Sequence, residues 1–141
     1  MPLDTIAAPS ELDIRVYYED TDTGGVVYYA NYLKFFERGR TEWLRRLGVD
    51  QSDMARREHK VFVVKSVQIQ YCKPARLDDL VTVSSTVTRV GPASINFEQI
   101  ALRNGELLCK SAIQVCCVDR DTFRPAPFSR ELRALLKEVQ N

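Results

Sequence analysis

The pattern of hydrophobic and polar positions changes once along the chain, from a helical period to a period of two near residue 60. Between residues 32 and 47, large apolar residues recur at spacings of one to four, which predicts a long helix that buries one face. That face consists of Tyr32, Phe35, Phe36, Gly39, Trp43 and Leu47. Glycine inside a helix costs about 1 kcal/mol relative to alanine. We therefore expect another backbone to pack against the helix at Gly39.

The predicted helix has recognisable ends. Asn31 suits an N-cap if the regular helix begins late, and the alternative start lies near Tyr28. Gly48 follows Arg45 and Arg46, so we expect it to end the helix in the left-handed conformation.

From Lys60 onward the alternation is typical of strands. On the first strand one face carries Val61, Val63, Val67, Ile69 and Tyr71. Phe62 and Val64 break this alternation, which indicates a first half covered on both sides. Three more strands are expected over residues 80–90, 94–103 and 106–118, the last two joined by an Asn104-Gly105 hairpin. A short amphipathic helix, capped by Ser129, is predicted from Arg130 to about Val139.

Before the long helix, residues 15–18 are β-prone, with Val16 and Tyr18 on one face, and Asp22-Thr-Gly-Gly25 gives the backbone freedom to turn. The predicted order is a strand, a long helix, four strands in a meander and a short helix. One helix lying across a curved antiparallel sheet buries the apolar faces of both, so the fold class is α+β. We interpret residues 1–10 as a disordered lead-in and residues 11–141 as one domain.

Composition excludes several function classes. The chain has 141 residues and a formal net charge of +1, from 20 basic and 19 acidic residues, which does not favour a nucleic-acid or membrane-surface binder. No apolar run approaches the roughly 20 residues needed to cross a bilayer, and the N-terminus lacks the features of a signal peptide. Four cysteines without CxxC spacing indicate free thiols in a reducing cytoplasm. A single histidine, His59, argues against a zinc site and a Ser-His-Asp triad.

Asp22 is the leading candidate for chemistry. It precedes a Gly-Gly turn and a helix start, where free amides and the helix dipole would stabilise an oxyanion. The alternative is that Asp22 only forms the turn. Glu19 and Asp20 make the loop acidic, and Asp20-x-Asp22-x-x-Gly25 matches the start of an EF-hand loop. Position twelve would then be Asn31 and a strand precedes the loop, so we predict no metal site.

The segment Tyr17-Tyr-Glu-Asp-Thr-Asp-Thr-Gly-Gly-Val-Val-Tyr-Tyr-Ala-Asn-Tyr32 closely resembles the signature of hotdog-fold acyl-CoA thioesterases. Within these it is similar to the Tol–Pal-associated YbgC type of the wider 4-hydroxybenzoyl-CoA thioesterase family. The resemblance extends over roughly residues 12–128 and implies a hotdog fold, in which a curved five-stranded antiparallel sheet wraps a long central helix. Further matches are Phe36-Glu-Arg-Gly-Arg-Thr-Glu-Trp-Leu44, Phe62-Val-Val64, Pro74-Ala-Arg-Leu-Asp-Asp79, Val118-Asp119 and Arg124-Pro125.

The resemblance also implies an activity and a site. The activity is hydrolysis of an acyl-CoA to a free acid and CoA, with no cofactor beyond the CoA of the substrate. Asp22 would be the catalytic carboxylate, the Tyr29 amide would polarise the thioester carbonyl, and Gly25 would shape the turn. The site would lie between subunits of a dimer that builds a tetramer, and other residues would bind substrate there. These residues are Val63, Val64, Lys65, Ser66, Arg89, Ser94 and Arg124.

Two positions differ from the family pattern. Many relatives of the YbgC type carry His where this chain has Tyr29, which leaves the amide role intact. A basic cluster that holds CoA phosphates in the hydroxybenzoyl branch falls at Gly91-Pro92-Ala93 here, so hydroxybenzoyl specificity does not follow. Two rival functions stay open. One is a non-catalytic acyl-binding scaffold that docks acyl carrier protein or lipid-synthesis enzymes, and the other is a hotdog dehydratase, which normally needs a catalytic His.

Overall fold

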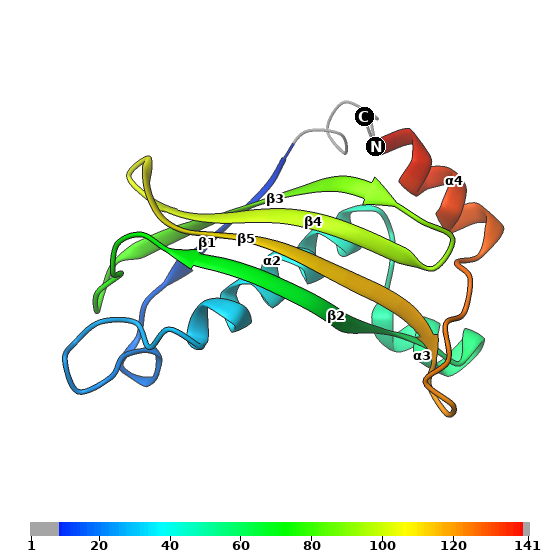
Figure 1. Cartoon of the computed structure of the whole chain (residues 1–141), viewed down its shortest axis with the longest axis horizontal. Helices are drawn as coiled ribbons and strands as arrows, with labels where there is room; N and C mark the ends of the chain where they lie inside the picture. The colour runs from blue at the N-terminus through cyan, green and yellow to red at the C-terminus, as the bar shows by residue number, and fades with distance from the viewer. Residues whose placement is uncertain (1–8, 140–141) are drawn as a thin grey trace.

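One long helix lies across the inner face of a five-stranded antiparallel sheet in the computed structural model, which describes residues 9–139 (Figure 1). The helix is α2, Asn31–Arg46, and the sheet curves around it. This is the α+β hotdog arrangement that the periodicity and the resemblance both predicted. The strands are β1 (Ser10–Arg15), β2 (Lys60–Tyr71), β3 (Leu80–Val90), β4 (Ser94–Arg103) and β5 (Glu106–Asp119). The shorter helices are the 3₁₀ helix η1 (Tyr18–Asp20), α3 (Gln51–Glu58) and α4 (Arg130–Val139).

The order of strands in the sheet is β1-β3-β4-β5-β2, so the predicted four-strand meander is wrong. Hairpins join β3, β4 and β5, but β2 pairs with β5 at the far edge. The reason lies in residues 72–79, which cross the end of the sheet instead of making a tight turn. The amides of Cys72 and Lys73 both donate to the Leu108 carbonyl, and the Asp79 main-chain carbonyl accepts from the Val16 amide at 2.9 Å.

The buried face of α2 is the one that the spacing predicted. Phe35 and Phe36 are fully buried, and Trp43 meets Phe97 of β4 edge to face, with ring centroids 5.5 Å apart. Gly39 does allow a close approach, but to side chains and not to the backbone that we expected. A Cβ at this position would lie 2.7 Å from Val83 Cγ1 and 2.9 Å from Gln99 Nε2.

A β-bulge at Lys65 changes which residues of β2 face the helix. The register pairs Phe62 with Cys117 and Val64 with Val115, both buried residues of β5. After the bulge the inward positions are Val67, Ile69 and Tyr71. Phe62 and Val64 therefore continue the inward face, whereas Val61 and Val63 point away from α2. The predicted face was wrong in its first half because the bulge inserts one residue and shifts the alternation.

The start of the chain also differs from its prediction. The strand covers Ser10–Arg15 and not residues 15–18, so Tyr18 lies in η1 and is 81% exposed. Ser10 is a buried strand residue, which shortens the predicted lead-in, while residues 1–8 lie outside the described part of the chain. Within residues 9–139, no helix is long and apolar enough to cross a membrane.

The ends of the helices follow local rules with one exception. Asn31 is the first residue of α2 and not its N-cap, a position held by Ala30. At the other end Gly48 has φ of 90°, and the amides of Gly48 and Val49 donate to the carbonyls of Arg45 and Leu44 in a Schellman motif. Ser129 caps α4 as predicted, by accepting from the Leu132 amide.

Candidate active site

Asp22 lies in a tight turn between η1 and α2. Its amide donates to the Val26 carbonyl at 2.9 Å, and its carbonyl accepts from the Gly25 amide at 3.1 Å. Gly25 has φ of 79°, the left-handed conformation that the turn was predicted to need. One carboxylate oxygen, Oδ1, accepts from the Gly24 amide at 2.8 Å. The side chain is exposed, and its other oxygen receives no hydrogen bond from residues 9–139. The turn thus fixes the direction of the carboxylate and leaves one oxygen available.

Two backbone amides just before α2 have no hydrogen-bond acceptor among the described residues. Asn31 donates to the Tyr28 carbonyl at 2.8 Å, and Tyr32 to the Tyr29 carbonyl at 3.4 Å. The amides of Tyr29 and Ala30 have no such partner among residues 9–139. Unpaired amides at a helix start carry the positive end of the helix dipole, so they suit an anionic or partly anionic oxygen.

Asp20 holds the acidic loop and the helix start together. Its carbonyl accepts from the Tyr28 amide at 3.0 Å and from the Asn31 side chain at 2.8 Å. Its carboxylate accepts from the Tyr17 amide at 2.9 Å, and the residue is buried. Of the acidic residues in this loop, Asp20 therefore has a structural role. The sequence pattern predicts Asn31 as an N-cap, whereas its side chain donates to the Asp20 carbonyl.

The 72–79 segment supports the other side of the loop. Val27 donates to the Ala75 carbonyl at 2.8 Å, and Val26 forms a β-bridge with Arg76. An ion-pair network anchors this segment, because Arg103 contacts Asp79 and Glu106, each at 2.7 Å. Partial burial acts to raise the pKa of Asp79, but hydrogen bonds from Arg103 and from the Arg76 amide outweigh it and lower that pKa. The carboxylates of the network thus stay charged at neutral pH.

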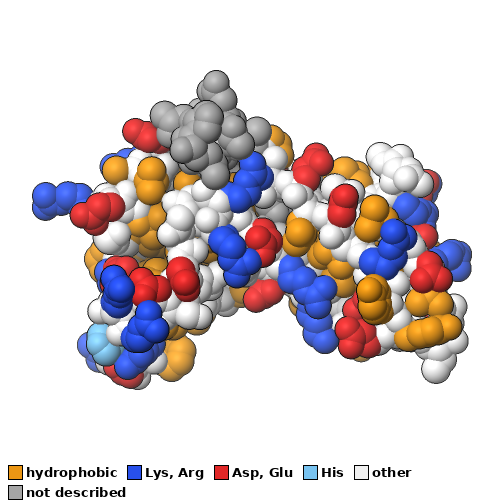
Figure 2. All heavy atoms as spheres, turned by 180° about the vertical axis from the view of Figure 1, so that it is seen from behind, with side chains coloured by type: hydrophobic (Ala, Val, Ile, Leu, Met, Phe, Trp, Pro, Cys, Tyr) orange, Lys and Arg blue, Asp and Glu red, His pale blue; other side chains and the backbone are white. Residues whose placement is uncertain are grey.

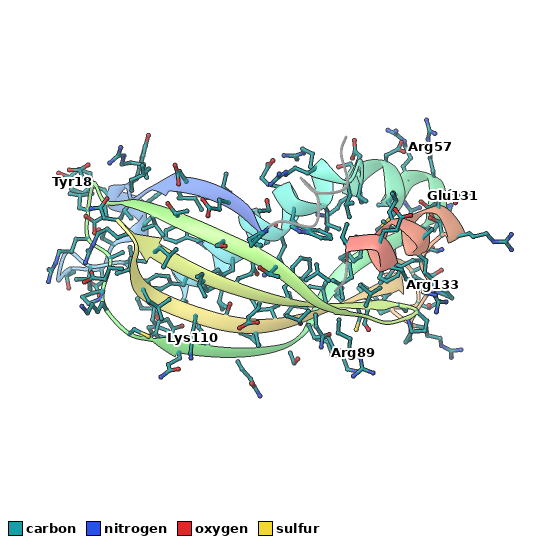
Figure 3. The ribbon with its side chains drawn as sticks, turned by 90° about the horizontal axis from the view of Figure 1, so that it is seen from above. Tyr18, Arg57, Arg89, Lys110, Glu131 and Arg133 are labelled. Atoms are coloured by element: carbon teal, nitrogen blue, oxygen red, sulfur yellow. The ribbon has the colours of Figure 1, made fainter. Side chains whose placement is uncertain are left out.

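The remaining candidates lie elsewhere in the chain. Ser94 of β4 and Val63 of β2 both lie opposite Cys116 of β5. In the next row across the sheet, Arg89 of β3 lies opposite Asn96, Asn96 opposite Gln114, and Gln114 opposite Ser66. These four candidates lie on the outer face of the sheet, and Figure 3 shows Arg89 projecting away from α2. Arg124 follows β5, at the end of the sheet that carries Arg89. The Asp22 loop is at the opposite end (Figure 1). One chain alone therefore does not bring the two groups of candidates together.

Val64 and Lys65 belong to β2, which is an edge strand of the sheet. Val64 lines a groove of about 520 Å³ between β2 and α2, together with Val67, Ile113 and Leu33. Lys65 is the exposed bulge residue. Arg40 borders the same groove as a buried cation, with its guanidinium donating to Gln99 Oε1 at 3.0 Å. Burial lowers the pKa of Arg40, although Glu37 one turn earlier opposes that shift.

The cysteines and the surface charges suggest no second reactive centre. Burial raises the pKa of Cys109 to about 12 and that of Cys117 to about 11, so both thiols stay protonated. Cys72 is exposed and Cys116 is half-buried. Across residues 9–139, no three His, Cys, Asp or Glu side chains cluster as a metal site would require. Figure 2 shows basic and acidic side chains intermixed on one face, with hydrophobic side chains at the end that holds the Asp22 loop.

Comparison with known proteins identifies the family. The model of the thioesterase superfamily matches residues 24–110, a span that starts in the Asp22–Gly25 turn and ends in β5. The chain belongs to the thioesterase superfamily. Acyl-CoA thioesterase YbgC from Haemophilus influenzae is 49% identical over 127 residues, which cover 90% of this chain and 93% of the relative. Acyl-CoA thioester hydrolase YbgC from Escherichia coli O157:H7 is 39% identical, covering 89% and 93%. The chain is accordingly a thioester hydrolase of the YbgC type.

Solved structures share the fold. A probable thioesterase from Bartonella henselae has a TM-score of 0.82 and 34% identity, covering 86% of this chain and all of that one. A DHNA-CoA thioesterase from Staphylococcus aureus has a TM-score of 0.88 at 24% identity, covering 93% and 90%. The similarity to the DHNA-CoA thioesterase shows the hotdog fold alone.

Proposed function

We propose that this protein hydrolyses acyl-CoA to a free acid and CoA, with Asp22 as the catalytic carboxylate and the Tyr29 amide as an oxyanion donor. The observation that carries the proposal is the pairing of these two groups in one short loop. The carboxylate has one oxygen held by Gly24 and one available, and the amide has no acceptor among residues 9–139. The names of the YbgC relatives supply the class of substrate.

In the first of two routes, the Asp22 carboxylate attacks the thioester carbonyl. The carbon–sulfur bond breaks, CoA leaves as a thiolate that takes a proton from water, and a mixed anhydride remains on Asp22. Water then cleaves the anhydride and releases the acid. In the second route Asp22 takes a proton from water, which attacks the carbonyl directly; the carbon–sulfur bond then breaks, and the CoA thiolate takes the proton from Asp22 as the acid is released. Both routes develop negative charge on the carbonyl oxygen, which the Tyr29 amide and the α2 dipole would stabilise. Neither route requires a metal or a prosthetic group.

We propose that the working unit is a homodimer formed along β2. Among residues 9–139, β2 pairs only with β5, so its outer edge has free backbone groups. Apolar side chains flank that edge, with Val64 48%, Val67 38% and Leu33 40% exposed. An exposed edge with apolar flanks favours pairing with another strand. A second copy of β2 would satisfy both the backbone groups and the apolar groove.

A two-fold axis through the middle of β2 would also bring the separate candidates together. The middle of Lys60–Tyr71 falls between Lys65 and Ser66. Antiparallel pairing about this point sets the Lys60 end of one subunit beside the Tyr71 end of the other. The Asp22 loop of one subunit would then face the end of its partner that carries Arg89, Ser94 and Arg124. The tetramer and the cytoplasmic location that the sequence suggested stay predictions.

The test is free-thiol release from a panel of CoA esters, from short aliphatic through palmitoyl to benzoyl. Asp22→Asn should lose at least about a hundredfold in kcat on the best substrate while retaining its fold and its affinity for CoA esters. Glu19→Gln is the matched control, because it removes another exposed carboxylate from the same loop. An Asp22→Asn protein with normal turnover would refute the assignment. A folded wild type without turnover on any CoA ester would redirect the search to esters of acyl carrier protein.

A further inference from the structure

Tyr71, the last residue of β2, makes a hydrogen bond to the segment that holds the free amides. Its hydroxyl donates to the Tyr29 carbonyl over 3.1 Å. That carbonyl belongs to the peptide unit whose N–H is the amide of Ala30. The two residues are 42 positions apart, so the bond ties the loop before α2 to the edge of the sheet. Both side chains are exposed, which makes a purely structural hydrogen bond of little value to the fold.

The Tyr29–Ala30 peptide has few other restraints from the described residues. The N-cap position carries Ala30, which provides no side-chain cap. Among residues 9–139, the only other bond to the Tyr29 carbonyl is the long 3.4 Å bond from the Tyr32 amide. On the opposite side, the Asp20 carbonyl holds Tyr28 and Asn31. Tyr71 thus anchors this peptide from the side of the sheet, and without it the Tyr29 carbonyl would keep only the long bond from Tyr32 among residues 9–139.

The Tyr71 ring is itself held in place. Its centroid lies 6.0 Å from that of Tyr29, edge to face, and 5.7 Å from that of Tyr32. Tyr32 is buried, and its hydroxyl accepts from the Ala75 amide at 3.1 Å. Aromatic pairs at these separations stabilise one relative orientation. Partial burial raises the pKa of Tyr71, so its hydroxyl keeps its proton and remains a donor through the neutral range.

We propose that Tyr71 is a positioning residue for the thioesterase reaction, acting through the Tyr29–Ala30 peptide. By donating to the Tyr29 carbonyl it fixes the orientation of this peptide and so the direction of the Ala30 amide, while the preceding peptide, which carries the Tyr29 amide, is held by the bond from the Asn31 amide to the Tyr28 carbonyl. Donation to a peptide carbonyl also polarises the N–H of the same peptide, which makes Ala30 a stronger donor. The site then offers two preorganised amides to the developing oxyanion, and preorganised donors act on the transition state more than on the bound substrate. This inference rests on the proposed function.

The test is Tyr71→Phe, which removes the hydroxyl and keeps the ring. Loss of one neutral hydrogen bond to the oxyanion-binding peptide should lower kcat about three- to tenfold, with KM changed less than twofold. Affinity for a non-hydrolysable thioether analogue of the best acyl-CoA should be unchanged, as should the thermal midpoint. Tyr18→Phe is the control, because this tyrosine is 81% exposed and its hydroxyl bonds to no described residue. It should retain wild-type kinetics.

The possible outcomes separate this inference from the proposed function. Wild-type kcat in Tyr71→Phe, alongside an inactive Asp22→Asn, overturns the positioning role and leaves the thioesterase assignment standing. A Tyr71→Phe protein with raised KM and unchanged kcat also overturns it, since Tyr71 would then bind substrate. Full activity in Asp22→Asn overturns the proposed function itself. A lowered kcat with unchanged KM and analogue affinity supports Tyr71 as a positioning residue.

Discussion

The Gln99 side-chain amide donates to the main-chain carbonyl of Phe36 over 2.8 Å, in the middle of the contact between β4 and α2. The same nitrogen donates to Ser85 Oγ at 2.8 Å, and Gln99 Oε1 accepts from Arg40. All four residues are buried. A polar side chain thus connects the helix to two strands where the sequence pattern predicts only apolar packing.

Gln99→Leu should destabilise the protein. The substitution leaves the Arg40 guanidinium without its only described hydrogen-bond acceptor and Ser85 without a donor, and each unsatisfied buried group costs about 1–3 kcal/mol. We expect the free energy of unfolding in urea to fall by about 3 kcal/mol. Gln68→Leu, an exposed glutamine on the outer face of β2, should change it by less than about 0.5 kcal/mol. Equal stability of the two variants would contradict the role given to Gln99.

Gly39→Ala should also destabilise the protein, although alanine is the better helix former. The new Cβ would lie 2.7 Å from Val83 Cγ1, a buried and rigid side chain. Overpacking typically costs about 1–3 kcal/mol, against a gain in helix propensity of about 1 kcal/mol. A net loss of about 1 kcal/mol in urea unfolding is expected. Lys34→Ala, an exposed position on the same helix, should be neutral, and a stabilised Gly39→Ala would show that the contact relaxes easily.

The Arg103 network predicts how stability depends on pH. Hydrogen bonds from Lys73 and Arg103 lower the pKa of Glu106, and Arg103 also helps to lower that of Asp79. A carboxylate with a lowered folded-state pKa stabilises the fold above its unfolded pKa, and that contribution is lost as the pH falls through the folded value. The difference in thermal midpoint between wild type and Arg103→Met should be constant above about pH 5 and shrink below about pH 4.

The control for this pH effect is Arg57→Met. Arg57 also contacts a carboxylate, Asp53, but within one exposed helix. Its substitution should leave the thermal midpoint almost unchanged at every pH. A gap between wild type and Arg103→Met that does not depend on pH would show that packing, and not charge, gives Arg103 its effect.

The proposed dimer predicts the effect of a charge on the β2 edge. Val67→Lys places a cation on the apolar flank next to the groove and should convert the dimer to a monomer at micromolar concentration, with thioesterase activity falling in parallel. Light scattering coupled to size exclusion measures the mass. Ser52→Lys, on the exposed side of α3, should retain the wild-type mass. A monomeric wild type with full activity would rule out a site shared between subunits.

Periodicity and turn chemistry predicted the elements with local causes. The face of α2, the end at Gly48 and the Asn104-Gly105 hairpin depend on residues close together in the chain, and each is present. Three other features depend on distant contacts. The place of β2 at the edge, the shift of its faces at Lys65 and the hydrogen bond of Asn31 to Asp20 are set by tertiary partners. No periodicity in the sequence reports them.

The candidate site divides in the same way. Asp22 and Gly25 could be named as candidates from sequence because an acidic residue before a Gly-Gly turn is a local signal, and the resemblance added the Tyr29 amide. The alternation predicts that Tyr71 shares the apolar face of its strand, but nothing near it in the sequence points to the Tyr29 carbonyl 42 residues away. A contact of this kind appears only when the sheet edge and the helix start meet in space.

The bulge at Lys65 bears on solubility. A regular, apolar edge of twelve residues would be a template for open-ended strand addition and, at high concentration, for fibrillar aggregation. An extra residue in the middle increases the local twist and interrupts the regular spacing of the free backbone groups, while the Lys65 ammonium sets a charge there. Such an edge can pair with one strand of the same twist but disfavours the repeated addition of flat strands. Removing Lys65 would leave a more regular amphipathic strand and, we expect, a protein that precipitates more readily.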